Sequence, residues 1–191
     1  MNNDYYPWGG DYTICSLHGC VAVVLLQVDY KPPHEIALYG PLKTENIGIE
    51  KIIANVISNP HIRYLIICGD DIKGHRPGES LIALHKFGID DNHRIINAPG
   101  AIPYIENLTN EALTRFYKQI TIINMIGIVD THEIDKATKE CIAHTPPSFG
   151  EPYIAIRIKP EVTLEITDKR ALHSKIVIDY MGKIKKREVE D

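Results

Sequence analysis

The sequence predicts an α/β domain built on a mainly parallel sheet with helices on both faces, followed by a C-terminal antiparallel β meander. Two observations lead to this prediction. Up to about residue 150, apolar runs rich in β-branched residues alternate with stretches that have the period of an amphipathic helix, and parallel neighbours need such crossovers. After Pro152 the period becomes two, which is typical of half-buried strands. We therefore expect a Rossmann-like body with an appended meander.

The body, residues 1–150, contains five predicted strands and four predicted helices. Val21–Val28 is a continuous apolar run, suited to a strand buried on both faces. From Thr44 the period changes, and the apolar residues between Ile49 and Ile57 form the stripe of a helix that ends by Asn59. The other strands are predicted at 36–39, 63–68, 94–97 and 121–126, and the other helices at 80–87, 110–118 and from 130 to about 145.

The last segment, residues 151–191, is expected to belong to the same domain, since about 40 residues bury too little surface to fold alone. Period-two strands are predicted at Ile154–Ile158, Val162–Ile166 and Ile176–Tyr180. The basic run Lys183–Arg187, followed by acidic residues, is interpreted as a solvated tail.

Composition is typical of a globular protein. The chain has 191 residues, 44% hydrophobic and 24% charged, with a formal net charge of -4, so charge gives no sign of nucleic-acid binding. Four cysteines lack the spacing of a zinc site or a disulfide framework, which favours a reducing compartment. No apolar run reaches the roughly 20 residues of a membrane-spanning helix. We therefore expect a cytoplasmic protein with no membrane insertion of its own.

Candidate ligand-binding residues lie in three loops that follow predicted strands, because ligands of open α/β sheets collect at the carboxyl ends of the strands. Each loop carries glycine, which allows tight turns and close approach of a ligand to the backbone. The first loop (40–46) contains Gly40, Pro41, Lys43, Thr44, Glu45 and Asn46; the second (69–80) contains Gly69, Gly74, His75, Gly78 and Ser80; the third (98–104) contains Ala98, Gly100, Ala101, Ile102, Pro103 and Tyr104.

His75 is the sharpest single candidate. A neutral imidazole ligates borderline metals well, and a loop lets it stand away from the protein towards a cofactor. A loop histidine with no function is the alternative interpretation. His85 lies on the following predicted helix beside Leu81 and Leu84 and is interpreted as a packing residue, and Cys68 as a buried hydrophobe. The phosphate-binding patterns G-x-x-x-x-G-K-[ST] and G-x-G-x-x-G are absent, which weakens a nucleotide-binding interpretation.

Three strings carry a family resemblance: GPLKTENIGIEKIIANVISNPHIRYLIICG (40–69), GHRPGESLIALHKFGID (74–90) and APGAIPYIENL (98–108). They closely resemble the A subunit of tetrahydromethanopterin S-methyltransferase, and Trp8–Tyr12 and Lys139–Ile142 are similar to flanking segments of the same family.

The resemblance implies a corrinoid (cobalamin) cofactor and a role in methanogenesis. In methanogenic archaea, that protein takes a methyl group from methyl-tetrahydromethanopterin and yields it to coenzyme M. The family's cobalt-ligating histidine lies in a G-H-x-x-G-x-S segment, which matches Gly74–Ser80 here, so the resemblance assigns His75 as the catalytic residue and cobalt ligand. The three loops would hold the corrinoid, and the implied partners are the subunits that handle the methyl donor and coenzyme M.

Two departures from known patterns bear on this interpretation. The widespread corrinoid motif D-x-H-x-x-G is not met, since residue 73 is Lys, so no carboxylate partner of His75 is predicted from spacing. The family's A subunit ends in a membrane anchor, whereas this sequence ends in the predicted meander, so a soluble homologue outside the membrane complex is expected. A corrinoid storage or delivery protein and a nucleotide-binding regulatory module are the alternative functions.

Overall fold

The computed structural model describes residues 5–156, 176–178 and 184–186. It divides into two compact units, Met1–Ile158 and Lys159–Asp191. In its described part, the first unit is an α/β fold with a five-stranded mixed sheet, in the order β1-β3-β2-β4-β5, and four helices. The strands are β1 (Thr13–Ile14), β2 (Val21–Leu25), β3 (Leu38–Pro41), β4 (Tyr64–Gly69) and β5 (Thr121–Ile126), and the helices are α1 (Ile47–Ser58), α2 (Pro77–Phe87), α3 (Asn110–Gln119) and α4 (Thr131–Ala143).

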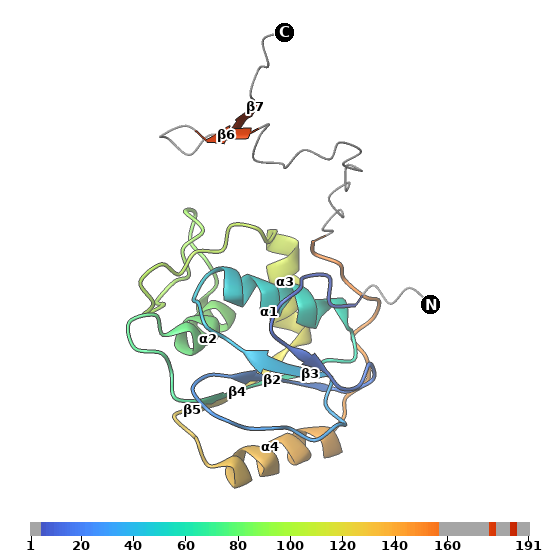
Figure 1. Ribbon diagram of the computed structural model, residues 1–191. Coiled ribbons are helices and arrows are strands. Elements are labelled where there is room, and N and C mark those ends of the chain that lie inside the picture. The colour runs from blue at the N-terminus through green and yellow to red at the C-terminus, as the bar shows by residue number, and fades with distance from the viewer. Residues whose placement is uncertain (1–4, 157–175, 179–183, 187–191) are drawn as a thin grey trace, which may run out of the picture. The chain divides into compact units, whose positions relative to one another are not determined.

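The sheet is mainly parallel, as predicted. β3, β2, β4 and β5 pair in parallel, and the short edge strand β1 runs antiparallel to β3. Figure 1 shows α1, α2 and α3 on one face of the sheet and α4 on the other. A sheet covered on both faces needs strands that are apolar on both faces, which explains the continuous apolar runs of β2 and β4.

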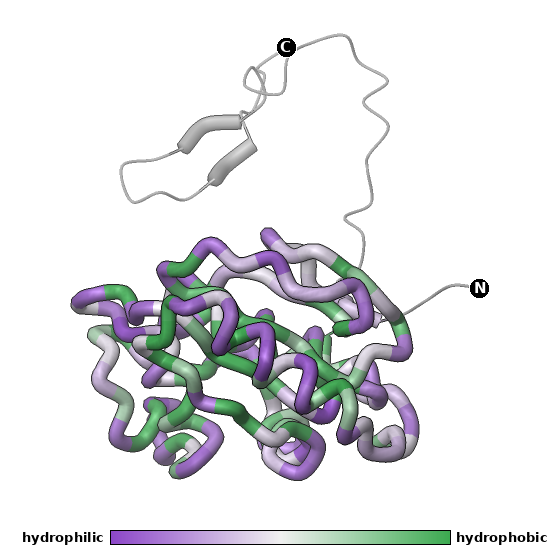
Figure 2. Tube along the Cα trace, turned by 90° about the horizontal axis from the view of Figure 1, so that it is seen from below, coloured by the Kyte–Doolittle hydropathy of each residue, from purple (hydrophilic) through white to green (hydrophobic). Residues whose placement is uncertain are grey.

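Two hydrophobic cores therefore lie on opposite faces of the central strands. Ala22 and Val24 of β2 join the core beneath α1 and α3, while Val21 and Val23 join the core above α4. This alternation follows from the period of two along a strand. Figure 2 shows the strongly hydrophobic stretches running through the centre of the unit.

The order of the strands creates a crevice at their carboxyl ends. β2 connects to β3 on one side, and the chain then crosses to β4 on the other side of β2. Tyr30, in the first connection, packs in the core next to α4, whereas Ile53 of α1, in the second connection, packs in the opposite core. Because the two connections lie on opposite faces of the sheet, neither covers the carboxyl ends of β2 and β4. The three candidate loops surround that region.

The strand predicted at 94–97 is wrong. The structure has isolated bridges there, between Ile89 and Ile95 and between Arg94 and Tyr104. His93 and Asn97 have φ values of 63° and 60°, in the left-handed region. These two residues interrupt the extended backbone on both sides of the apolar pair, so the segment forms a loop.

Of the predicted C-terminal meander, the described residues contain one short antiparallel pair, and the meander itself stays a prediction. β6 (Ile176–Ile178) lies within the strand predicted at 176–180 and pairs antiparallel with β7 (Ile184–Lys186). The interpretation of Lys183–Arg187 as a tail is therefore wrong at β7, whose backbone finds a pairing partner in β6. The segment 154–156 is not a strand. Instead, Ala155 and Ile156 pack on the core next to α1. The strand predicted at 162–166 lies outside the described residues.

Candidate functional site

The carboxyl ends of the strands bring together one residue from each of the three loops. Glu45 comes from the first loop, His75 from the second, and Ile102 from the third. His75 Nδ1 lies 3.1 Å from Glu45 Oε2, and the backbone N–H of Ile102 donates to Glu45 Oε1 at 2.9 Å. Glu45 is thus the shared partner that joins the other two loops.

Exposure differs sharply within the Glu45–His75 pair. The side chain of His75 is 58% exposed, whereas that of Glu45 is 3% exposed. Because the carboxylate accepts a hydrogen bond from Nδ1–H, the Nδ1–H tautomer is favoured and the Nε2 lone pair stays free. The pair therefore presents one free imidazole nitrogen to solvent, with its ring held by a buried anion.

The buried carboxyl of Glu45 is kept ionised by its hydrogen bonds. Burial raises its pKa, but hydrogen bonds from backbone N–H groups, including that of Ile102, and from His75 outweigh burial and hold the pKa below its ordinary value. Glu45 also lies just before α1, where Asn46 and Thr44 cap the first N–H groups of the helix. The positive end of the helix dipole favours an anion there.

The third loop approaches the other two through Gly100. A Cβ built on Gly100 would lie 2.6 Å from the carbonyl O of His75, 2.7 Å from Glu45 Cγ and 2.9 Å from Ser80 Oγ. These distances are shorter than any ordinary carbon contact, so only glycine fits. Farther along, Glu50 of α1 accepts hydrogen bonds from the backbone N–H groups of Glu106 and Asn107, both at 2.6 Å. Glycine and carboxylate together fix this loop against α1.

The second loop is shaped by Asp71 and by two residues with positive φ. Asp71 accepts hydrogen bonds from the N–H groups of Gly78 and Glu79 at 3.1 and 2.8 Å, and so caps α2. Gly74 and Arg76, on either side of His75, have φ values of 84° and 41°. The loop therefore turns sharply at both neighbours of His75, whose side chain is exposed.

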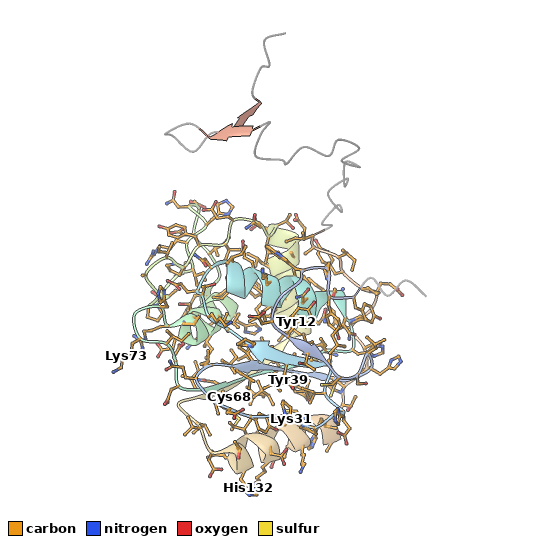
Figure 3. The ribbon with its side chains drawn as sticks, viewed as in Figure 1. Tyr12, Lys31, Tyr39, Cys68, Lys73 and His132 are labelled. Atoms are coloured by element: carbon orange, nitrogen blue, oxygen red, sulfur yellow. The ribbon has the colours of Figure 1, made fainter. Side chains whose placement is uncertain are left out.

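Lys73 takes no part in the pair. It stands where the widespread corrinoid motif has aspartate, and Figure 3 shows it at the outer edge of the unit, pointing away from the fold. Cys68 lies between the sheet and α4, and burial raises the pKa of its thiol to about 12. It stays a protonated hydrophobic residue, as predicted. His85 packs edge-on against Phe116 and contacts the carbonyl O of Ile120, also as predicted.

Two hollows lie next to the first two loops. An open one of about 780 Å³ lies at the carboxyl ends of the central strands beside His75, and is lined by Gln27, Asp70, Asp71, Ile72, Lys73, Gly74, Arg76, Glu79, Ile126 and Gly127. A smaller cavity of about 200 Å³ lies between α1 and strands β2 and β3, and its lining includes Gly40, Pro41, Lys43 and Thr44. The first residues of the first loop thus line the smaller cavity, whereas Glu45 of the same loop lies at His75.

The structure brings some of the predicted residues together and leaves others apart. Glu45, His75, Ser80, Gly100 and Ile102 form one cluster. The other predicted residues lie outside this cluster, in the neighbouring hollows or elsewhere in the loops. Gly69, with φ of 93°, lies against Val28, and the ring of Tyr104 stacks under Arg94. Reasoning from the sequence missed Glu50, Asp71 and the pairing of Glu45 with His75, since no short spacing connects residues 30 positions apart.

Fold and site together define a class of protein: an α/β domain that presents a carboxylate-held imidazole at the carboxyl end of a mainly parallel sheet. The family model for the A subunit of tetrahydromethanopterin S-methyltransferase matches residues 2–165, and the chain belongs to this family. This agrees with the resemblance carried by the three loop strings.

Individual relatives give the same result. The chain is 46% identical to the first of two A subunits of tetrahydromethanopterin S-methyltransferase in Methanothermobacter thermautotrophicus, over 78% of its own length and 65% of that protein. It is 40% identical to the second of these proteins, over 80% and 85% of the two chains. It is 44% identical to the A subunit of the same enzyme from Methanohalophilus mahii, over 82% and 66%. The chain thus spans slightly less than two thirds of the first of these relatives. Among the described residues, no helix has both the length and the hydropathy needed to cross a membrane.

Proposed function

We propose that this protein binds a corrinoid at the carboxyl ends of its strands and serves in methyl transfer, with His75 as the ligand to cobalt. One observation carries the proposal: a half-exposed imidazole whose Nδ1 is held by the buried carboxylate of Glu45 at 3.1 Å. A bound corrinoid would supply a cobalt ion to carry the methyl group, and the corrin ring itself would hold most of that ion's coordination positions. A single imidazole nitrogen is then what the protein has to add.

Glu45 supports this role in the way that outer partners support metal-bound histidines. A carboxylate that accepts from one ring nitrogen fixes the tautomer and the ring orientation and makes the other nitrogen more basic. In the widespread corrinoid motif an aspartate two residues before the histidine supplies this group. Here the carboxylate comes from another loop, so the absence of aspartate at position 73 does not deprive His75 of a partner.

The surrounding backbone suits a large flat ligand. The open hollow beside His75 is wide, its rim includes Gly74, and Gly100 lets the third loop lie close to the second. The connections from β2 to β3 and from β3 to β4 leave on opposite sides of β2, and in open α/β sheets such a switch point is where ligands bind, which supports the proposal. We propose that the loops at this end would hold the ring, and that the Nε2 of His75 would be the nitrogen available to the metal.

The test is reconstitution of the full chain with cobalamin, followed by electron paramagnetic resonance of the Co(II) form with nitrogen-14 and nitrogen-15 histidine. The hyperfine pattern should follow the label, and should lose that dependence in His75→Ala. Glu45→Gln should keep the ligand but weaken ligation by about tenfold or more, as loss of such partners does elsewhere. His34→Ala, an exposed histidine on another loop, is the matched control.

Two further results would count against the proposal. Folded protein that retains no cobalamin at micromolar concentrations would exclude corrinoid binding, and a hyperfine pattern indifferent to both label and variant would exclude His75. The proposed partners are the subunits that handle methyl-tetrahydromethanopterin and coenzyme M. Transfer of a labelled methyl group from methyl-tetrahydromethanopterin to the bound corrinoid, in the presence of a donor subunit, would separate methyl transfer from storage or delivery.

A further inference from the structure

A second pair of histidines lies at the amino ends of the same central strands. His18 lies in the turn that leads into β2, and His61 lies in the turn that leads into β4. β2 and β4 pair directly, with Val21 opposite Tyr64, so the two turns lie side by side. The candidate site described above is at the other end of these strands, and the histidine pair belongs to none of its loops.

The geometry of the pair fits a shared metal ion better than a hydrogen bond. His18 Nδ1 and His61 Nε2 are 3.4 Å apart, and the two rings are nearly perpendicular, at 81°. A hydrogen bond from a ring N–H usually spans about 2.7–3.2 Å. Two nitrogens that each lie about 2.0–2.1 Å from a tetrahedral Zn²⁺ are about 3.3–3.4 Å apart. The observed separation is therefore the one expected for two ligands of one tetrahedral ion.

Both turns are held in place by buried Asn59. Its side-chain Nδ2 donates to the carbonyl O of Leu17 at 3.0 Å, and its Oδ1 accepts from the N–H of His61 at 3.0 Å. One buried amide thus fixes the backbone of both turns next to the two histidines. Gly19 fixes the first turn further, because a Cβ there would lie 2.3 Å from the backbone N of Ala37. The two imidazoles are therefore carried on backbone that is already arranged, which lowers the entropy cost of binding.

Solvent reaches the pair, since His18 is exposed and His61 is half-buried. Among the residues that the structure describes, no third His, Cys, Asp or Glu completes a metal-binding group. Imidazole favours zinc and its neighbours over magnesium and calcium, which prefer oxygen ligands. We propose that His18 and His61 bind Zn²⁺ through Nδ1 and Nε2, with water in the remaining positions. This site is independent of the proposed corrinoid function.

Isothermal titration of the full chain with Zn²⁺ tests the proposal. His18→Ala and His61→Ala should each weaken one binding event by at least about tenfold, because even outer partners of metal ligands are worth that much. His34→Ala, an exposed histidine outside the pair, should leave the binding event unchanged, and so should His75→Ala. Equal binding by wild type and by both pair variants would overturn the proposal, as would an equal loss in the His34→Ala control.

A measurement on the wild type alone makes the test independent of how the variants fold. Long-range nitrogen-15 spectra of the histidine rings report the ligating nitrogens directly. One equivalent of Zn²⁺ should shift the Nδ1 signal of His18 and the Nε2 signal of His61 together, while the rings of His34 and His75 stay unshifted. If the first equivalent of Zn²⁺ shifts the signals of other histidine rings, the site is not a zinc site. The same holds if the signals of His18 and His61 show only a hydrogen bond between the two rings and do not respond to Zn²⁺.

Discussion

The two ends of the parallel strands are held by different chemistry. At the carboxyl ends, buried or half-buried carboxylates accept hydrogen bonds from backbone N–H groups: Glu45 from Ile102 and Glu50 from Glu106 and Asn107 in the loops, and Asp71 from Gly78 and Glu79 in the first turn of α2. At the amino ends, side-chain donors hold the backbone: the amides of Asn59 and Gln119 and the guanidinium group of Arg63 donate to backbone carbonyl groups. Asn59 ties two turns together, and Gln119 Nε2 donates to the carbonyl groups of Val56, Asn59 and Ile62 at 3.2, 2.9 and 3.0 Å.

This difference follows from which backbone groups each end leaves unpaired. Helices that run antiparallel to the strands begin near the carboxyl ends and finish near the amino ends. Free N–H groups therefore gather at one end, where anions accept from them, and free carbonyl groups gather at the other, where amide N–H groups donate. The end that carries the candidate site is therefore the end whose anchors are carboxylates, which acid protonates, so acid should act on it first.

The largest effect is expected from Gln119→Leu at the amino end. Gln119 is 1% exposed, and its loss removes the side-chain donor of the buried carbonyl groups of Val56 and Ile62, whereas the carbonyl of Asn59 keeps the N–H of Ile62. Each unsatisfied buried group costs about 1–3 kcal/mol, so two such groups give an expected loss of about 2–6 kcal/mol in the free energy of unfolding. Urea denaturation measures this loss. A loss below about 1 kcal/mol would mean that water replaces the amide, and that this end is not anchored as described.

Gly100→Ala should have the next largest effect, at the carboxyl end. The added Cβ meets His75, Glu45 and Ser80, and the atom it meets in His75 is a backbone carbonyl, which cannot easily move. Overpacking of this kind costs about 1–3 kcal/mol and should displace the third loop. Gly9→Ala is the matched control, since nothing lies within 4 Å of its added Cβ. Equal melting temperatures for the two variants would show that the loops are less tightly joined than the distances indicate.

The central sheet was predictable because its signal is local. The apolar runs of β2 and β4 and the helical stripe of α1 are complete within a few residues, so periodicity located them. The segment 94–97 was wrongly predicted as a strand for the same reason, because its two isoleucines fit the local pattern of a strand. Its actual loop conformation depends on the left-handed backbone of residues 93 and 97. Asparagine and histidine adopt that conformation more readily than most residues, which was the only available hint.

The candidate site was predictable only as a set of loops. Strand ends and glycines located the first two loops, the third was located from a strand predicted at 94–97 that the structure does not contain, and the family resemblance selected His75. The pairing of Glu45 with His75 was not predictable, because α1 and β4 lie between them in the sequence. The lengths of these two elements, which no short motif records, determine that the two side chains meet. Lys73 in place of aspartate even argued against a carboxylate partner. When the carboxylate partner of a histidine comes from another loop, the spacing of residues in a single sequence does not reveal it.

The pH dependence of Glu45→Gln sharpens the comparison between the two ends. The pKa of Glu45 in the folded protein is held below its ordinary value by hydrogen bonds. Its ionised form therefore adds stability that is fully present above the unfolded-chain pKa of about 4.3 and is lost as pH falls through the lower folded value. At neutral pH we expect Glu45→Gln to cost about 1–2 kcal/mol, as for other charge-assisted hydrogen bonds.

The measurement is urea unfolding of wild type and variant between neutral pH and about pH 3, a range that spans the ordinary glutamate pKa. The difference between wild type and Glu45→Gln should shrink as pH falls. Asn59→Ala at the amino end is the control, since an amide does not titrate and its cost should stay constant over the same range. A constant difference for Glu45→Gln as well would mean that the carboxylate has the same pKa folded and unfolded.

His75→Ala should have the smallest effect on stability, although it removes the central residue of the proposed site. The side chain of His75 is 58% exposed, and its contact is with one carboxylate that also accepts from Ile102. Water can replace the imidazole at Glu45, so we expect a change within about 0.5 kcal/mol in the free energy of unfolding of the corrinoid-free protein. Urea unfolding of that form checks this value. A loss above about 2 kcal/mol would show that the imidazole holds the three loops together, and that the Glu45–His75 pair is a structural anchor instead of a ligand held ready for a metal.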